Sequence, residues 1–485
     1  MTTTERAPKS VEDLHNLLQN DTKVKVAGID VDGILRGKFM SKDKFLSAVK
    51  GEGFGFCSVI FGWDMHDLVY PNELLVSNRA NGYRDILAHI DLSTYRRISW
   101  EANVPFFLLS FLDPETHEPI PVCPRGTLTK AIKSAEGFGW EPVAGVEYEY
   151  FQFKETPQTV AEKRFTNLSS LTSGKYFHDL FDESKKFGIE IEGHHTETGP
   201  GVYETALAYT SALRMADNAT LFKFVAKSIG MKRGVIPSFM AKPWANYRAH
   251  SFQDAAEGRT DAQSQDTRFM SQEGEWFLAG VLDGLVDSNR PVGKCYACGI
   301  RALGLTFAQL VPTINGYKRL VGGESFWAPN AVTYGYDSRA ASIRIISPPS
   351  VPPSATRLEI RVPGADMQPH FALASIFRLG LRGIEKKVQL PGPPISVLQR
   401  ENKAPIRLAM SLEEGTKKLL AENSIAREVL GDDFVDHYGG TRSHEVKLWN
   451  EAVTNWEGES YAYMKFLRTF LNVTLLEVER YLELA

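Results

Sequence analysis

Residues 190–204 read Glu-Ile-Glu-Gly-His-His-Thr-Glu-Thr-Gly-Pro-Gly-Val-Tyr-Glu and contain two histidines and four acids. Strand-like runs flank the Gly-Pro-Gly segment, so the pattern predicts a hairpin. We expect this turn to make Glu197 and Glu204 face each other from adjacent strands. Oxygen donors with an occasional imidazole suit Mg²⁺ or Mn²⁺ better than Zn²⁺. The alternative is a charged hairpin that faces solvent.

A second acidic stretch lies upstream, at Gly145-Val-Glu-Tyr-Glu-Tyr-Phe151. Glu147 and Glu149 are two residues apart, so on a strand both side chains point to one face. The flanking aromatic residues make the surroundings apolar. Two neighbouring carboxylates are difficult to ionise there unless a cation neutralises them. A solvent-facing strand edge is the alternative interpretation.

Arginines supply the third part of the pattern, and they are Arg319, Arg339, Arg344, Arg357 and Arg361. Arg339 and Arg344 fall in a segment that otherwise reads as a core strand, where arginine needs an anionic partner. Carboxylates and phosphates match its forked donors, although a surface salt bridge could explain any single arginine. Acids for divalent cations and arginines for phosphate together indicate ATP-dependent phosphoryl transfer. The sequence has no Gly-x-x-x-x-Gly-Lys loop, which excludes a P-loop fold.

The overall composition excludes several classes of protein. The 485 residues include 55 basic and 59 acidic side chains, for a formal charge of -4. This balance gives no electrostatic reason to expect nucleic acid or an anionic membrane as a partner. The longest strongly apolar run, 104–112, is far shorter than the roughly 20 residues that span a bilayer. Four cysteines make no disulfide framework, and the start lacks a signal-peptide core, so a reduced, cytoplasmic protein is expected.

The secondary-structure pattern divides the chain into three parts. Residues 1–20 form a polar N-terminal segment with one short helix, and residues 21–115 form a small β-rich domain with a hairpin at Asp32-Gly33. Residues 116–485 mix helices and strands without regular alternation, which favours an α+β fold over a doubly wound sheet. The expected strands are at 23–30, from 36 onward, and at 54–61, 85–90, 104–112 and 143–153. The expected helices are at 11–18, 125–135, 176–187, 211–231 and in the region from 412 to the end.

With these motifs in order along the chain, the sequence resembles the glutamine synthetase family over nearly its full length. The matching segments are 32–38, 146–151, 195–204, 216–223, 239–243, 315–320 and 357–361. The resemblance implies an α+β fold, with a small N-terminal β-grasp domain and a large catalytic domain on a curved antiparallel sheet. It also implies a homo-oligomer of stacked rings whose active sites lie between subunits.

The resemblance further implies a role for each site residue. The first metal would bind Glu149, Glu197 and Glu204, and the second would bind Glu147, Glu359 and His250. Glu192 and Tyr209 would lie at the nucleotide, with Tyr209 against adenine, and Arg339, Arg344 and Arg357 would hold its phosphates. Arg319 and Arg361 would hold glutamate. The residues implied in catalysis are Arg319, Arg339, Asp64 and Glu324.

The implied activity is that of a glutamate–ammonia ligase that makes glutamine in cytoplasmic nitrogen metabolism. The γ-carboxylate of L-glutamate would attack ATP to give γ-glutamyl phosphate, and ammonia would then displace phosphate. Two or three Mg²⁺ or Mn²⁺ ions per site would stabilise charge on the phosphoryl group, together with the arginines. Burial would protect the intermediate from hydrolysis.

Two departures from the family pattern concern the acceptor. The stretch that binds ammonium through an aspartate is replaced by Phe56-Cys57-Ser58, so Asp64 or Asp67 would substitute. The flap glutamate before Ala-Pro is replaced by Trp327, with Glu324 three residues earlier. An apolar residue in place of a base suggests, as an alternative, a γ-glutamyl ligase for a primary amine or polyamine.

Two further departures concern the integrity of the site. The stretch 243–254 after Lys242 is short, lacks glycine and has one histidine, so His250 could fall out of register with the family's ligand. Segments 286–308 and 458–476 resemble insertions, and the first contains Cys295-Tyr-Ala-Cys298, which we interpret as buried thiols rather than a zinc site. The altered nucleotide loop makes a non-catalytic, ring-forming homologue the alternative of another class.

Overall fold

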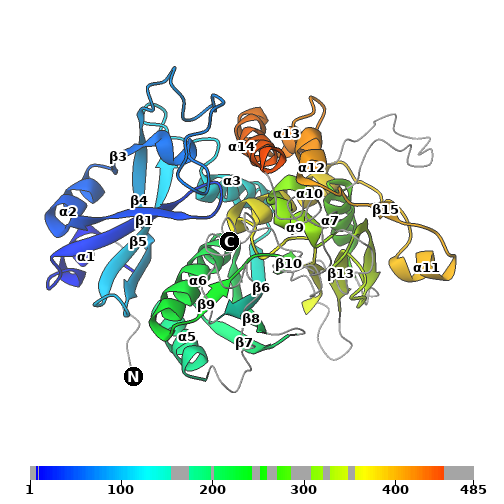
Figure 1. Ribbon diagram of the computed structural model, residues 1–485, viewed down its shortest axis with the longest axis horizontal. Helices are drawn as coiled ribbons and strands as arrows, with labels where there is room; N and C mark the ends of the chain where they lie inside the picture. Colours follow the sequence, from blue (N-terminus) through cyan, green and yellow to red (C-terminus); the bar gives the residue numbers. More distant parts are fainter. Residues whose placement is uncertain are drawn as a thin grey trace, which may run out of the picture.

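Two β-sheets of different size, each packed against helices, organise the chain (Figure 1). The structure, a computed structural model, describes residues 7–8, 10–153, 174–197, 201–242, 252–258, 270–285, 307–320, 328–347 and 355–452. For 252–258 it fixes the backbone alone. In these ranges no helix is both long and apolar enough to cross a membrane.

The smaller sheet has five strands in the order β2-β1-β5-β4-β3. Its strands are β1 (Lys23–Ile29), β2 (Leu35–Ser41), β3 (Phe54–Cys57), β4 (Asp85–Ile98) and β5 (Val104–Leu112). The predicted hairpin is present, since Gly33 has a φ of +82° and Asp30 Oδ1 accepts the backbone N–H groups of Asp32 and Ile34. Helices α1 (Val11–Leu17) and α2 (Lys42–Lys50) contribute to its apolar core. The β-grasp assignment and the domain boundaries stay predictions.

Two strand predictions in this sheet were wrong at their ends. The strand expected over 54–61 stops at Cys57, and Ser58–Phe61 forms a 3₁₀ turn because Gly62 donates its N–H to the Val59 carbonyl at 2.7 Å. The strand expected over 85–90 continues to Ile98 through an irregularity between Asp91 and Arg96. Such a bulge bends a strand without ending it.

The larger sheet has eight strands in the order β12-β13-β14-β10-β6-β8-β7, with β9 paired to β6. These are β6 (Pro142–Phe153), β7 (Ile191–Thr196), β8 (Val202–Ser211), β9 (Ile236–Ser238), β10 (Phe252–Gly258), β12 (Tyr334–Tyr336), β13 (Ile343–Ile346) and β14 (Arg357–Ile360). All pairs are antiparallel except β12 with β13. The predicted α+β fold with a curved antiparallel sheet is confirmed (Figure 1). A separate two-stranded pair joins β11 (Ala331–Val332) to β15 (Ile406–Arg407).

Helices cover one face of the larger sheet, and those predicted at 125–135, 176–187 and 211–231 are present with small shifts at their ends. The longer helices are α3 (Pro124–Glu136), α5 (Gly174–Lys186), α6 (Ala212–Arg233), α7 (Gln272–Asp283), α10 (Pro369–Glu385) and α14 (Asp432–Glu451). The short helices are α8 (Phe307–Leu310), α9 (Ile314–Lys318), α11 (Ile395–Arg400), α12 (Leu412–Leu419) and α13 (Ile425–Leu430). On β6, Tyr148 stacks on Phe222 of α6, so α6 lies beneath the strand that carries the predicted acids.

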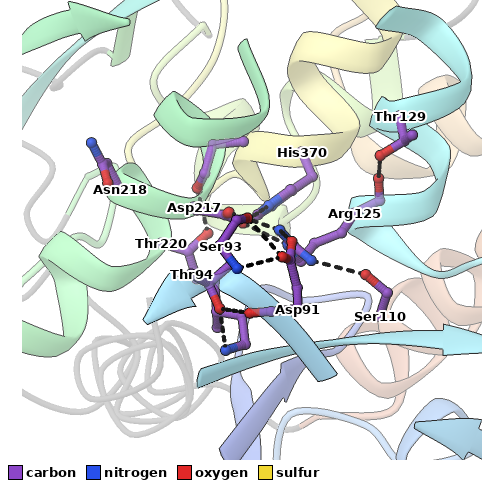
Figure 2. Close-up of polar contacts among 12 residues, drawn as sticks. Asp91, Ser93, Thr94, Ser110, Arg125, Thr129, Asp217, Asn218, Thr220 and His370 are labelled. Carbon is purple, nitrogen blue, oxygen red and sulfur yellow. Dashed lines mark hydrogen bonds and ion pairs between the residues drawn. The ribbon is translucent and has the colours of Figure 1, made fainter. Parts of the chain in front are cut away.

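A buried ionic network joins the smaller sheet to the helices of the larger one (Figure 2). Arg125 on α3 contacts Asp217 on α6 at 2.9 Å and Asp91 on β4 at 2.7 Å. His370 at the start of α10 approaches the same Asp217 oxygen at 2.9 Å. Burial alone would raise the pKa of Asp217, but Arg125 and His370 outweigh it and hold that pKa far below its usual value. The network therefore fixes α6 and α10 relative to β4.

Candidate active site

Strands β6 and β8 hold the first acidic residues of the site. Along β6, Val146, Tyr148 and Tyr150 are buried, whereas Glu147 and Glu149 alternate with them and are partly exposed. The two glutamates therefore share the face away from α6, as their spacing predicted. Glu149 lies directly opposite Glu204 on β8. The structure thus brings together two acids that are far apart in the sequence.

Strand β14 brings a further acid to this group across β10. Glu359 and Gly145 are both register partners of Ala255 on β10, so one strand separates Glu359 from β6. Burial raises the pKa of the Glu147 carboxyl, and repulsion from the Glu359 carboxylate is the next largest cause. The two side chains are therefore close enough to interact through their charges.

The β7–β8 hairpin adds Glu197 and, unexpectedly, a histidine. Glu204 is paired with His195 rather than with Glu197, which follows the end of β7 and closes the hairpin through its N–H to the Val202 carbonyl. Glu197 and Glu204 come together as expected, with donor atoms within 4.8 Å of each other, but they are not register partners, because the strands pair only up to Thr196 and Tyr203. His195 Nε2 lies 3.7 Å from Glu204 Oε1, and its Nδ1 lies 3.9 Å from Glu197 Oε1.

His195, Glu197 and Glu204 form a group that could hold a metal ion. Each offers a donor atom, and these atoms lie within 4.8 Å of one another. Sequence reasoning noted the histidine pair but assigned neither of them to a ligand set. The two-residue spacing of His195 and Glu197 was the available signal, since it puts both on one face of a strand.

The pKa of Glu204 indicates that the acidic face of β6 and β8 needs a cation. Burial raises the pKa of Glu204 to about 8, with repulsion from Glu149, Glu147 and Glu197 adding to the effect. Acids in such a setting stay protonated unless a cation offsets their charge. A donor set of several carboxylates and one imidazole fits a hard divalent cation.

Two of the predicted arginines are held by Glu359. Arg344 on β13 donates from Nη1 to Glu359 Oε2 at 2.9 Å, and Arg361 Nε lies 3.1 Å from Glu359 Oε1. Arg344 also donates from Nε to Asp337 at 3.0 Å. This arrangement fixes both guanidinium groups beside the acidic face, where an anionic ligand could meet them.

Arg339 does not occupy the core strand that the sequence suggested. It lies in an exposed turn before β13, and its carbonyl accepts a hydrogen bond from Arg361. Arg339 lies outside the strand because β13 begins only at Ile343, after the turn at Ser338–Ala341. Arg357 lies on β14, close enough to Glu147 for its positive charge to oppose the rise in the pKa of that carboxyl.

Arg319 is fully buried behind the end of β14. Its Nη1 donates to the Val362 carbonyl at 2.7 Å, and its Nη2 donates to the Arg361 carbonyl at 2.6 Å. Burial lowers the pKa of Arg319 to about 10, against the opposing effect of the Glu149 charge. The two hydrogen bonds fix the backbone that carries Arg361.

The remaining predicted residues lie at the margin of this group or elsewhere. Tyr209, at the end of β8, is 66% exposed, and Glu192 is exposed on β7. Asp64 is buried, and its Oδ1 accepts the N–H groups of His66 and Leu68. Asp67, the alternative to Asp64, is more exposed and pairs with Arg36. His250, Glu324, Trp327, Cys295 and Cys298 lie outside the described residues.

Comparison with known proteins identifies the family. A model of the glutamine synthetase catalytic domain matches residues 121–461. The chain belongs to the glutamine synthetase family. Type-1 glutamine synthetase 2 of Dictyostelium discoideum is 40% identical over 460 residues, which cover 90% of this chain and 83% of that protein. Glutamate–isopropylamine ligase of a Pseudomonas species is 30% identical over 92% of this chain and 95% of its own length.

A solved structure described as "Apo GmaS without ligand" shares the fold of this glutamine synthetase homologue. It has a TM-score of 0.74 at 21% identity and covers 93% of this chain and 99% of its own. The family resemblance drawn from the motifs is therefore confirmed. As a member of the glutamine synthetase family, which uses ATP and divalent metals, the protein is a ligase.

Proposed function

We propose that this protein joins L-glutamate to ammonia in an ATP-dependent reaction through γ-glutamyl phosphate. One observation carries the proposal, the gathering of carboxylates from β6, β8 and β14 on one face of the larger sheet. Arg344 and Arg361, fixed on Glu359, add positive charge beside that face. Acids for divalent cations next to arginines for an anion match the needs of phosphoryl transfer.

We assign the acids to two metal positions. Glu149, Glu197 and Glu204 would hold one Mg²⁺ or Mn²⁺ ion, and Glu147 and Glu359 would hold another with His250. The raised pKa values of Glu147 and Glu204 support this assignment, because a bound cation would relieve the repulsion that causes them. When bound, such ions neutralise charge on the transferred phosphoryl group.

The arginines and Tyr209 would position the two substrates. Arg339, Arg344 and Arg357 would contact the ATP phosphates, and Tyr209 would stack on adenine with Glu192 nearby. Arg361 would bind glutamate, with Arg319 fixing its backbone or contacting the substrate. A γ-carboxylate oxygen of glutamate attacks the γ-phosphorus, and ADP leaves. Ammonia then attacks the γ-carbonyl carbon, phosphate leaves, and Glu324 takes the surplus proton.

Assembly would complete the site. Members of this family are typically oligomers, and we infer that this chain forms a homo-oligomer with active sites at subunit interfaces. In that arrangement Asp64 or Asp67 would come from a neighbouring subunit. Because Asp64 closes a turn of its own chain, Asp67 is the more accessible of the two. We place the protein in the cytoplasm.

A primary amine or polyamine is the second candidate acceptor. Ser58 is completely buried, and it stands where the family's ammonium site has acidic character. Two relatives also bear names of amine ligases, namely glutamate–isopropylamine ligase and γ-glutamylethanolamide synthetase GlnA4 of Streptomyces coelicolor, the latter 29% identical over 93% of this chain. Loss of an acid near an ammonium site would favour a larger, less polar nucleophile.

The deciding experiment measures phosphate release with glutamate, ATP and Mg²⁺ at varied acceptor concentration. The acceptors are ammonia, isopropylamine, ethanolamine and putrescine, and we expect the highest kcat/KM for ammonia. A higher value for an amine would transfer the proposal to the second candidate. ATP binding without release for any acceptor would support a non-catalytic homologue. The variant Glu204→Gln serves as a control for contaminating ATPase activity, since it should release no phosphate.

A further inference from the structure

The two adjacent histidines of β7 point to opposite faces of the sheet. The His194 ring stacks on Tyr203 with 5.6 Å between centroids and lies 4.3 Å from the Phe177 ring of α5. Its Nδ1 is 2.7 Å from the Thr205 hydroxyl. His195 faces the other way, towards Glu197 and Glu204. His194 therefore contributes to packing against α5, whereas His195 belongs to the acidic face.

The hydrogen bonding of His195 determines which ring nitrogen carries the proton. Its Nδ1 lies 3.2 Å from the carbonyl oxygen of Thr196. A carbonyl can only accept, so Nδ1 is the donor and Nε2 of the neutral ring keeps its lone pair. Histidines that bind metals commonly donate their other ring nitrogen to a backbone carbonyl in this way. The ring is thus prepared to use Nε2 as a ligand.

The distances around Nε2 suit a shared ion better than a hydrogen bond. The 3.7 Å separation from Glu204 Oε1 is too long for a hydrogen bond. Donors held about 2.1 Å from one ion lie about 3 to 4 Å from each other. The His195 side chain is also 56% exposed, which leaves room for an ion to enter and for the ring to turn towards it.

We propose that His195 is a metal ligand of this protein through Nε2, together with Glu197 and Glu204, and that it favours Mn²⁺ over Mg²⁺ at that position. The identity of the site rests on the proposed function. Mg²⁺ prefers an all-oxygen shell with several waters, whereas a transition-metal ion gains more from an imidazole. The histidine therefore sets the metal preference, and the glutamates provide the charge.

Pulsed EPR of the Mn²⁺-loaded full-length protein tests this directly, because a coordinated imidazole nitrogen modulates the echo. Because His250 is assigned to the other metal position, the variants are compared in a His250→Asn background. There we expect nitrogen modulation with His195 intact and with the matched change His194→Asn, and its loss with His195→Asn. Calorimetry should then show the Kd for Mn²⁺ raised about 10- to 100-fold in His195→Asn. The Kd for Mg²⁺ should change less than about threefold, since asparagine supplies an oxygen donor. Because His195 is exposed, we expect His195→Asn to fold like the wild type, and circular dichroism checks that it does.

Two results would overturn the proposal. One is bound Mn²⁺ without nitrogen modulation in the wild type. The other is modulation that survives in His195→Asn and disappears in His250→Asn, which would assign the imidazole to the other histidine. Turnover with glutamate and ATP is measured on the same samples. Turnover without nitrogen coupling would reject the role of His195 but not the proposed function. Nitrogen coupling without turnover would reject the proposed function but not the role of His195.

Discussion

Glu149 of β6 and Glu204 of β8 lie directly opposite each other in the sheet, and burial and mutual repulsion raise the pKa of Glu204 to about 8. At neutral pH a proton therefore remains on this pair when no cation is bound. Carboxylates that share a proton in this way bind a divalent ion by exchanging the proton for the metal. By the proposed assignment, this pair would link metal binding to pH and to stability.

Addition of Mn²⁺ or Mg²⁺ should stabilise the metal-free protein. At about 100 times its Kd, a ligand that binds only the folded state adds about 2.7 kcal/mol to the free energy of unfolding. We expect thermal denaturation after EDTA treatment to show a higher Tm when metal is restored. Glu204→Gln should lose most of that rise, while the control Glu190→Gln, an exposed residue just before β7, should keep it. An equal rise in Glu204→Gln would contradict a metal site at this residue.

Asp217→Asn should destabilise the protein by about 3 to 5 kcal/mol, because it leaves the buried Arg125 without its fully buried carboxylate partner. Asp91→Asn is the matched control, since the Asp91 side chain contacts the same guanidinium but is 26% exposed. We expect a loss of about 1 kcal/mol for that variant. Urea denaturation of both variants measures the difference. Similar losses in the two variants would show that the network is not organised around Asp217.

Most helices and strands could be predicted from the sequence, because the spacing of their apolar residues matches the face that is buried. On β6 the alternation of Glu147 and Glu149 with buried tyrosines matches a half-buried strand, and it also placed the acids on one face. The end of β3 was missed because Ser58–Phe61 is apolar enough to read as a strand, yet it turns through a local hydrogen bond to Val59. Local patterns do not contain such turn geometry.

The site was predictable in composition but not in register. Acidic residues that act as ligands can be recognised by type and spacing, and Glu147, Glu149, Glu204 and Glu359 do come together. The residue opposite Glu204 depends on the register between β7 and β8. A shift of one or two residues in that register would exchange Glu197 for His195. Arg344 and Glu359 are fifteen positions apart in the sequence. They form an ion pair because β13 and β14 are neighbours in the sheet.

Arg344→Gln should lower kcat by about 10²- to 10³-fold, because a preorganised positive charge beside the transferred phosphoryl group would be lost. Its position is set by Glu359 and Asp337, so Asp337→Asn should produce a smaller loss in the same direction. Steady-state phosphate release measures both variants, with Arg400→Gln on α11 as the control for removal of a positive charge. Unchanged turnover in Arg344→Gln would remove this arginine from the phosphate site.

A pH effect on stability should come from His437 of α14, which joins that helix to Phe61 and Val76. Its Nδ1 accepts the Val76 N–H at 3.2 Å, and its Nε2 donates to the Phe61 carbonyl at 3.0 Å, so only the neutral ring satisfies both contacts. Burial lowers the pKa of His437 from 6.5 to about 4.

Because the pKa of His437 is lower in the folded state, the unfolded chain binds more protons as the pH falls below 6.5. The stability that this residue contributes is complete above pH 6.5 and is lost towards pH 4, by about 3 kcal/mol in total. Urea denaturation at pH 7 and pH 5 should show a smaller pH effect in His437→Gln than in the wild type. His178→Gln, at an exposed position of α5, should leave the pH effect unchanged. If His437→Gln keeps the full wild-type slope, the acid sensitivity of this interface has another source.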